Sequence, residues 1–289
     1  MGVDRRSPIN RRSLIKGVAA AAAGVVASGC GAGDDTARGG KAPGDPLSAS
    51  GAPEPGRSAA APHPGAASVP PGSAPPAAGA LPAPVALPAE VARAGTGRPE
   101  VALTFHGQGE PAGVERLLAV VERARVGVTV LAVGTWLGEY PAMAGRVLAG
   151  GHELGNHSEN HLDMLSMDAE TAYREIAACA ARLTALTGSH GRWFRPSQTQ
   201  YANAVVKAQA ARAGYPTCLA YSLDSRDHTE PGSAAVVRNV LDKVAPGDVV
   251  SLHFGHDGTT AALPAILDGL RVRGLRPVTA SALFAPAAA

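Results

Sequence analysis

Several of the nine histidines stand where a short apolar run stops. His106 ends the run "EVALTF". His157 and His161 lie four residues apart in "GNHSENHLD" and would face the same way if that segment turns helically. Two neutral imidazoles at this spacing can hold a divalent metal such as zinc, although alone the pair also fits two surface or capping histidines. It is not the H-E-x-x-H motif of metalloproteases, because Glu159 is in the wrong place.

Other polar residues follow other apolar runs. Arg195 follows "RWF", Asp224 and Asp227 lie in "LDSRDH", and His253 ends "DVVSLH". Singly, each has an ordinary explanation as an ion pair, a helix cap or a local hydrogen bond. Together, at successive ends of apolar runs, they predict one layer of catalytic or metal-binding side chains.

The apolar runs alternate with helical stretches and predict an α/β fold. The expected strands are "EVALTF", "VGVTVLAV", "GHELGN", "RWFRP", "PTCLAYSL", "GDVVSLHF" and "LRPVTA". About seven alternations of strand and helix favour a parallel sheet with helical crossovers, either open and doubly wound or closed into a barrel. In both architectures functional groups gather beyond the carboxyl ends of the strands.

The clearest expected helix begins after Ser166 or Asp168, either of which could cap it, and ends at Gly188. Apolar residues recur at helical spacing between these limits, namely Ala172, Ile176, Cys179, Leu183 and Leu186. Cys179 and Cys218 could pair in an oxidising compartment, but a disulfide also requires that their α-carbons come close together.

Composition narrows the class of protein. A chain of 289 residues with 45% hydrophobic residues can bury the core of one large domain or two small ones. A formal net charge of +2 gives no basic footprint for nucleic acid, so we expect no nucleic-acid partner. A nucleotide site is also disfavoured, because no glycine-rich loop followed by Lys and Ser or Thr occurs.

Residues 1–30 resemble a twin-arginine export signal joined to a lipoprotein cleavage site. Arg11 and Arg12 precede a short apolar run that ends in small residues and Cys30. The run covers about 13 residues, whereas a membrane-spanning helix needs roughly 20. A plain membrane anchor and a secreted protein cut elsewhere are the alternatives. We expect a lipid on Cys30 that anchors the chain to the outer face of the cytoplasmic membrane.

Residues 31–98 consist mainly of Ala, Pro, Gly and Ser, with hardly any large apolar side chains. Such a segment cannot bury enough apolar surface to offset the entropy of ordering it. We therefore expect a disordered linker, partly stiffened by polyproline-type stretches, and a folded domain over residues 99–289.

The motifs of this domain resemble those of the polysaccharide deacetylase family, also called carbohydrate esterase family 4 or the NodB homology domain. "ALTFHG", "NHSENH", "FRP", "DSRDH" and "SLHF" follow the order and rough spacing of the five family motifs. The resemblance covers essentially residues 99–285. It implies a distorted (β/α) barrel with about seven parallel strands, a divalent metal, and removal of N-acetyl or O-acetyl groups from a glycan.

The resemblance also implies roles for individual residues. His157 and His161 would hold the metal, expected to be zinc, and His253 would act as the acid that protonates the leaving amine. Arg195 would brace the catalytic base. These assignments come from the family pattern and not from spacing alone.

The sequence also departs from the family pattern. Members usually carry two aspartates after "TF", the first as general base and the second as a metal ligand, and here the positions are His106 and Gly107. The aromatic residue and glycine that usually follow the arginine-proline motif are Ser197 and Gln198. A position usually held by tryptophan is His228.

His106 therefore has two predicted roles. A nearby positive charge on Arg195 would disfavour imidazolium, and a neutral ring can ligate a metal or accept a proton. His106 either completes a three-histidine metal site or acts as base beside a two-histidine site. We favour the first, because the glycine that follows contributes no side chain. Asp224, Asp227 or Glu110 would then take the role of base.

The expected function is metal-dependent removal of acetyl groups from an amino-sugar polymer of the cell envelope, such as peptidoglycan, by a monomeric protein. One alternative is a catalytically silent glycan-binding module, which the lost aspartates favour and the intact histidines oppose. The other is a metal amidase that acts on a C–N bond outside sugars.

Overall fold

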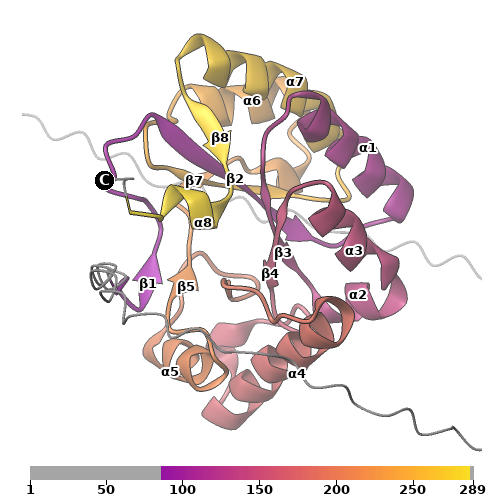
Figure 1. Ribbon diagram of the computed structural model, residues 1–289, viewed down its shortest axis with the longest axis vertical. Helices are drawn as coiled ribbons and strands as arrows, with labels where there is room; N and C mark the ends of the chain where they lie inside the picture. Colours follow the sequence, from indigo (N-terminus) through magenta and orange to yellow (C-terminus); the bar gives the residue numbers. More distant parts are fainter. Residues whose placement is uncertain (1–85, 287–289) are drawn as a thin grey trace, which may run out of the picture. The chain divides into compact units, whose positions relative to one another are not determined.

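The strand that carries His106 lies in the middle of the parallel sheet (Figure 1). In the computed structural model, which describes residues 86–286, β2 (Glu100–Gly107) is buried along its whole length. It pairs in parallel with β3 (Thr129–Ala132) on one side and β7 (Val249–His253) on the other. Burial on both faces explains why "EVALTF" reads as a nearly continuous apolar run.

The parallel array extends on both sides of these three strands. The remaining strands are β4 (Glu153–Asn156), β6 (Leu223–Asp224), β8 (Arg276–Val278), β1 (Glu90–Val91) and β5 (Cys218–Leu219). The order is β4-β3-β2-β7-β6, with β8 also paired to β2, and β1 pairs with β5. All of these strand pairs are parallel, which confirms the predicted α/β class.

Isolated β-bridges connect the outer strands, so that the array of strands curves towards a barrel. Phe194 bridges Asn156 at the end of β4 and Cys218 in β5, so the array continues from β4 to β5 and β1. Arg93, just after β1, bridges Asp248, just before β7. The strands thus follow a curved, irregular path, a distorted barrel in which one wall is held by single bridges.

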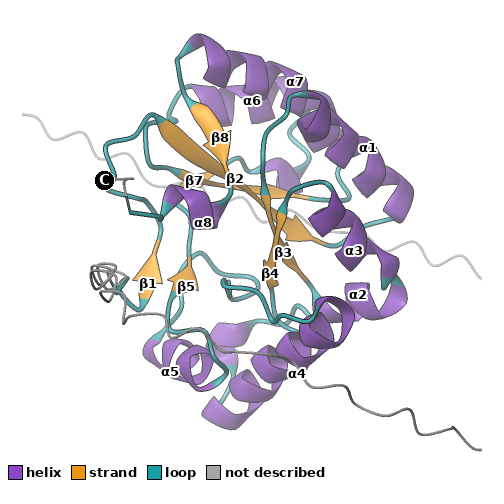
Figure 2. Ribbon diagram, in the orientation of Figure 1, coloured by secondary structure: helices purple, strands orange, loops and turns teal. Residues whose placement is uncertain are grey.

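Helices lie around the strands (Figure 2). Their bounds are α1 (Pro111–Arg123), α2 (Gly134–Glu139), α3 (Ala142–Ala149), α4 (Ala169–Thr187), α5 (Ala204–Arg212), α6 (Ser233–Leu241), α7 (Asp257–Val272) and α8 (Ala280–Leu283). The main apolar core lies between the strands and these helices, and includes Phe105, Leu117, Leu252 and Leu263, none of which is more than 1% exposed. No helix among the described residues is long and apolar enough to cross a membrane.

The predicted helix near residue 170 is confirmed as α4. The side chain of Asp168 caps it by accepting a hydrogen bond from the Thr171 N–H at 2.7 Å, and Gly188 ends it in the left-handed region at φ 79°. Ile176 and Cys179 are buried as expected, whereas Leu186 is 38% exposed, because it lies in the last turn beyond the sheet-facing stripe.

Replacing Gly188 with alanine is expected to lower the free energy of unfolding by about 1–2 kcal/mol, because a Cβ is disfavoured at positive φ. A Cβ at this position would meet no atom within 4 Å, so the cost is one of backbone conformation alone. Denaturant unfolding measures it. The matched control is Gly145→Ala in the interior of α3, where space is equally open and the change is expected to stabilise by about 0.5–1 kcal/mol.

Two expectations about chain organisation are wrong. "RWFRP" is not a regular strand, because only Phe194 pairs, through its single bridges.

The predicted linker extends to residue 98, but Glu90–Val91 already pair with β5, and Arg98 donates a hydrogen bond from Nε to Glu100 at 2.7 Å. Backbone pairing with β5 stabilises Glu90–Val91, although the surrounding sequence has few large apolar side chains. The predicted signal and most of the predicted linker lie outside the described residues.

Candidate metal and catalytic centre

The histidines singled out in the sequence meet at the carboxyl ends of the strands. His106 at the end of β2 is the register partner of His253 at the end of β7, and His157 follows β4. The ring centroids of His106 lie 4.3 Å from those of both His157 and His253, and the rings of His157 and His161 lie 5.0 Å apart. Parallel strands make this possible, because their carboxyl ends share one edge.

His106, His157 and His161, here called the first histidine group, each place a ring nitrogen within 4.8 Å of the others. His157 Nδ1 lies 2.9 Å from the Arg195 carbonyl, which can only accept, so Nδ1 carries the proton and Nε2 carries a lone pair. This Nε2 is buried and has no hydrogen-bond partner among the described residues. A buried imidazole lone pair beside two further imidazoles suits a divalent metal such as zinc.

The spacing of two of these rings also suits zinc. With Zn–N distances of about 2.0–2.1 Å, two imidazoles on one tetrahedral ion have ring centres roughly 5 Å apart. The rings of His157 and His161 lie 5.0 Å apart.

The two histidines of "NHSENH" do not converge through a helical turn, and that part of the prediction is wrong. Residues 157–163 form a bend without regular structure, with Ser158 at φ 67° and His161 at φ 56°. These left-handed residues fold the segment back on itself. Asn160 is held by hydrogen bonds to Glu175 on α4, from its backbone N–H at 2.9 Å and its side-chain amide at 2.7 Å.

Burial keeps the first histidine group neutral. Desolvation lowers the pKa of His106 and of His157 well below the usual histidine value, and neighbouring imidazoles lower both further. Arg195 adds to the effect on both rings. The pKa of the less buried His161 is lowered in the same direction, first by desolvation and then by His253. Neutral imidazole is the form that ligates metals.

These depressed pKa values predict a loss of stability in acid. The unfolded chain binds protons at these histidines below about pH 6.5 whereas the folded chain does not, so unfolding becomes easier as pH falls. Each of His106 and His157 is expected to contribute up to about 1.4 kcal/mol per pH unit below that point. Denaturant unfolding of metal-stripped protein from pH 7 to 5 measures the slope. It should be shallower in His106→Gln, and an equal slope would contradict the assignment.

Because Gly107 has no side chain, His106 is the residue at the end of β2 that can contribute a ligand to the first histidine group. A Cβ at position 107 would meet Val130 Cγ1 at 2.7 Å and the Ala132 Cα at 3.1 Å. The glycine therefore abuts β3 directly. His106 itself is 8% exposed, and its Nε2 lies 3.4 Å from the Ser251 hydroxyl.

Arg195 is fully buried, and its charge acts on the neighbouring rings of His106 and His157. Its Nε donates to the Leu219 carbonyl at 2.8 Å and one Nη donates to the Thr104 hydroxyl at 2.9 Å, while the other Nη has no partner among the described residues. Within residues 86–286 no carboxylate forms an ion pair with Arg195. Burial lowers its pKa to about 9. Arg195, which the family resemblance assigns to brace a catalytic base, thus lies beside His106.

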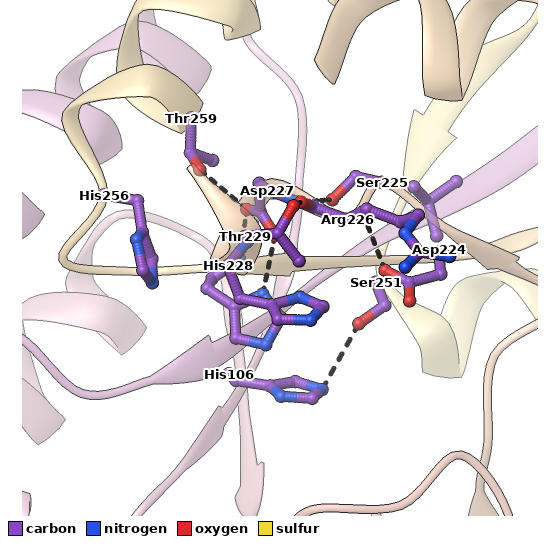
Figure 3. Close-up of polar contacts among 12 residues, drawn as sticks. His106, Asp224, Ser225, Arg226, Asp227, His228, Thr229, Ser251, His256 and Thr259 are labelled. Atoms are coloured by element: carbon purple, nitrogen blue, oxygen red, sulfur yellow. Dashed lines mark hydrogen bonds and ion pairs between the residues drawn. The ribbon is translucent and has the colours of Figure 1, made fainter. Parts of the chain in front are cut away.

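A second group, Asp227, His228 and His253, adjoins the first, because the His253 ring lies 4.3 Å from that of His106. Figure 3 shows Asp227 and His228 on the same side of the molecule as His106. Asp227 Oδ1 accepts a hydrogen bond from His253 Nδ1 at 2.7 Å, which leaves His253 Nε2 with the lone pair. The other oxygen accepts from the Thr259 hydroxyl at 2.6 Å and the His253 N–H at 2.8 Å. Burial opposes ionisation of Asp227, but hydrogen bonds from His253 and Thr259 outweigh it and lower the pKa of the carboxyl.

Two other predicted carboxylates do not join the histidines. Asp224 turns back to accept a hydrogen bond from the Arg226 N–H at 2.8 Å and belongs to neither group. Glu110 precedes α1 and lines a cavity of about 770 Å³ with Trp136, Tyr140 and His256. This cavity neighbours the second group through His256, but none of the first histidine group lines it.

Thr259 and Ser251 are the residues that sequence reasoning missed. Thr259 lies in the first turn of α7, 32 residues beyond Asp227, and only the fold brings the two together. Ser251 lies two residues before His253 on β7, so the alternation of side chains along a strand was a usable signal that it faces the same side.

Comparison with known proteins gives the family. A family model described as polysaccharide deacetylase matches residues 93–218. A chitooligosaccharide deacetylase of Sinorhizobium fredii is 30% identical over 206 residues, which cover 64% of this chain and 91% of that protein. This chain belongs to the polysaccharide deacetylase family. A peptidoglycan-N-acetylglucosamine deacetylase of Bacillus cereus is 32% identical over 196 residues, covering 64% of this polysaccharide deacetylase chain and 87% of the relative.

A solved structure agrees with this polysaccharide deacetylase fold. It is a mutant of a CE4 family pseudoenzyme with restored enzymatic activity, 25% identical to this chain, with a TM-score of 0.64. The match covers 69% of this chain and 72% of that one. The family resemblance read from the five motifs is thereby confirmed.

Proposed function

We propose that this polysaccharide deacetylase is a metal-dependent hydrolase that removes N-acetyl groups from an amino-sugar polymer of the cell envelope. The observation that carries the metal dependence is the buried His157 Nε2, whose lone pair has no partner among the described residues and which belongs to a group of three neutral imidazoles. The names of the relatives support the substrate class, since they act on chitooligosaccharide and on peptidoglycan N-acetylglucosamine.

In this proposal His106, His157 and His161 hold the ion, expected to be zinc. The residues fit, because all three offer a ring nitrogen and two of the rings have the separation expected for a tetrahedral ion. When bound, such an ion supplies Lewis-acid chemistry that polarises an acetyl carbonyl and acidifies water. His106 thereby takes over the ligand role that the family pattern gives to an aspartate at the position of Gly107.

His253 serves both proton transfers. Its Nε2 takes a proton as water attacks the acetyl carbon, and the same proton then goes to the leaving nitrogen as the C–N bond breaks, which gives acetate and a free amine. Asp227 fixes the ring through Nδ1 and stabilises the imidazolium that forms between the two steps. A separate carboxylate base is not required, and Asp224 and Glu110 are left out of the mechanism.

Arg195 acts on His106 through its charge. The guanidinium lies next to the first histidine group and disfavours protonation of the His106 ring, so the ring stays available as a ligand. In the same proposal the replaced first-motif aspartates leave this arginine without a carboxylate.

We also propose that the protein works outside the cytoplasm as a monomer. The signal-like residues 1–30 and the linker-like segment after them support export and a lipid on Cys30, which would hold the domain beside the cell wall. Cys179 and Cys218 are both free and buried in the structure, so no disulfide enters the proposal.

A silent glycan-binding module is the second candidate. Its support is the unpaired buried Arg195 and the likeness to a pseudoenzyme, which in its solved form needed mutation for activity. Elemental analysis of the full chain, together with acetate release from N-acetylglucosamine oligomers and from peptidoglycan, separates the two. Bound zinc with acetate release supports the hydrolase. Metal-free protein that binds glycan and releases no acetate supports the module.

A further inference from the structure

The histidine array continues beyond the first histidine group. The His253 ring lies 4.3 Å from that of His106, and the His228 and His256 rings lie 5.1 Å and 5.9 Å from that of His253. Asp227, His228 and His253 each place a possible ligand atom within 4.8 Å of the others. Figure 3 shows His228 close to Asp227, above His106. A second set of donors thus stands beside the first.

We propose that this second group forms a separate divalent-metal site, with His228 and His253 as ligands and zinc as the expected ion. The separation of 5.1 Å between their ring centroids matches the roughly 5 Å expected for two imidazoles on one tetrahedral ion. Water completes the coordination. The site goes beyond the proposed function, which uses the first histidine group alone for metal.

Asp227 prepares His253 for this role. The carboxylate accepts the Nδ1 proton of His253, so Nε2 presents its lone pair outward, in the carboxylate–histidine arrangement that raises the basicity of metal-bound imidazoles. Four hydrogen bonds fix the carboxylate, from the Thr259 hydroxyl, His253 Nδ1 and the backbone N–H groups of His228 and His253. Asp227 is 2% exposed, so its charge acts on the ion with little solvent screening.

The local backbone conformation positions His228 near His253. Arg226 at φ 57° and Glu230 at φ 53° adopt left-handed conformations on either side of the short turn η2 (Asp227–Thr229). Non-glycine residues in this region carry a conformational cost, so surrounding contacts must hold the turn in place. Within residues 86–286 the exposed His228 ring makes no hydrogen bond, and its nitrogens remain free for an ion.

Occupation of the second group would withdraw His253 from catalysis. An ion bound at Nε2 takes the lone pair that accepts the proton from water, so excess metal is expected to inhibit the enzyme. This consequence rests on the proposed function, whereas the binding site itself does not. Repulsion from an ion in the adjoining first histidine group makes the second group the weaker site.

Zinc titration of the metal-stripped full chain tests the site, with bound metal counted by equilibrium dialysis and elemental analysis. We expect two zinc ions per chain in the wild type, one tight and one weaker, and loss of the weaker ion in His228→Ala. His190→Ala is the matched control, because His190 is exposed and packs on Tyr215, away from the array; it should bind two. One ion in the wild type, or unchanged binding in His228→Ala, would overturn the proposal.

Acetate release in the same titration separates this proposal from the proposed function. We expect the wild-type rate to fall as zinc exceeds one equivalent and the rate of His228→Ala to fall less. If the chain releases no acetate but binds two ions and loses one in His228→Ala, the second site stands and the proposed function fails. If zinc inhibits His228→Ala as strongly as the wild type, the inhibitory role of the second group is refuted.

Discussion

Replacing His106 with alanine is expected to lower zinc affinity by more than about 100-fold and to abolish acetate release. The change removes one of three ring nitrogens that converge within 4.8 Å. Substitutions of residues that merely orient a metal ligand already cost about 10- to 100-fold in affinity or activity, so loss of a direct ligand should cost more. Zinc competition with a chromophoric chelator and an acetate assay on N-acetylglucosamine oligomers measure the two effects.

Three controls sharpen the His106 experiment. His190→Ala removes an exposed histidine outside the site and should change neither quantity. Ser251→Ala removes only the contact at 3.4 Å to His106 Nε2 and should have a small effect. His106→Asp would place a carboxylate near the unpaired Arg195 and is expected to raise the melting temperature. Unchanged zinc affinity in His106→Ala would refute the ligand role, and unchanged activity would refute both predicted roles.

Replacing Asp227 with asparagine is expected to reduce acetate release by about 10²- to 10⁴-fold, while the zinc in the first histidine group stays bound. This is the range that a positioned acid–base group contributes. An amide cannot stabilise an imidazolium as a carboxylate does, and its NH₂ group favours the wrong tautomer of His253. Steady-state kinetics should show the loss in kcat, because the interaction strengthens as His253 takes the proton.

Thr259→Val is the matched control for Asp227. It removes one hydrogen bond of 2.6 Å to the carboxylate and leaves its charge and its contact with His253 in place. We expect a reduction of about 10-fold or less, the size of one lost hydrogen bond. If Asp227→Asn behaves like Thr259→Val, the carboxylate has only a structural role.

The sequence was sufficient for the fold class and for the gathering of His106, His157 and His253. Apolar runs that end in polar residues place those residues at one edge of a parallel sheet, whichever strands are neighbours. The helix that became α4 was equally readable, since Asp168 and Gly188 bound an apolar stripe of helical period. These signals are local in sequence, so they do not depend on which strands pair with one another.

Features that depend on contacts distant in sequence were not readable. The bend at Ser158 and His161 arises because Asn160 bonds Glu175 on α4, and nothing in "NHSENH" specifies that contact. Residues before position 99 read as linker because the strand Glu90–Val91 is stabilised mainly by its pairing with β5. Asp224 and Asp227 looked equivalent in "DSRDH", yet only Asp227 contacts His253.

The close approach of Gly107 to β3 restricts which side chains this position can accept. An aspartate at this position would drive its Cβ to 2.7 Å from Val130 and to 3.1 Å from the backbone of Ala132, so β3 would have to move before the new carboxylate could be accommodated. A second acidic side chain at this end of β2 therefore requires coordinated changes in β2 and β3, and a designer who wants one must rebuild the two strands together.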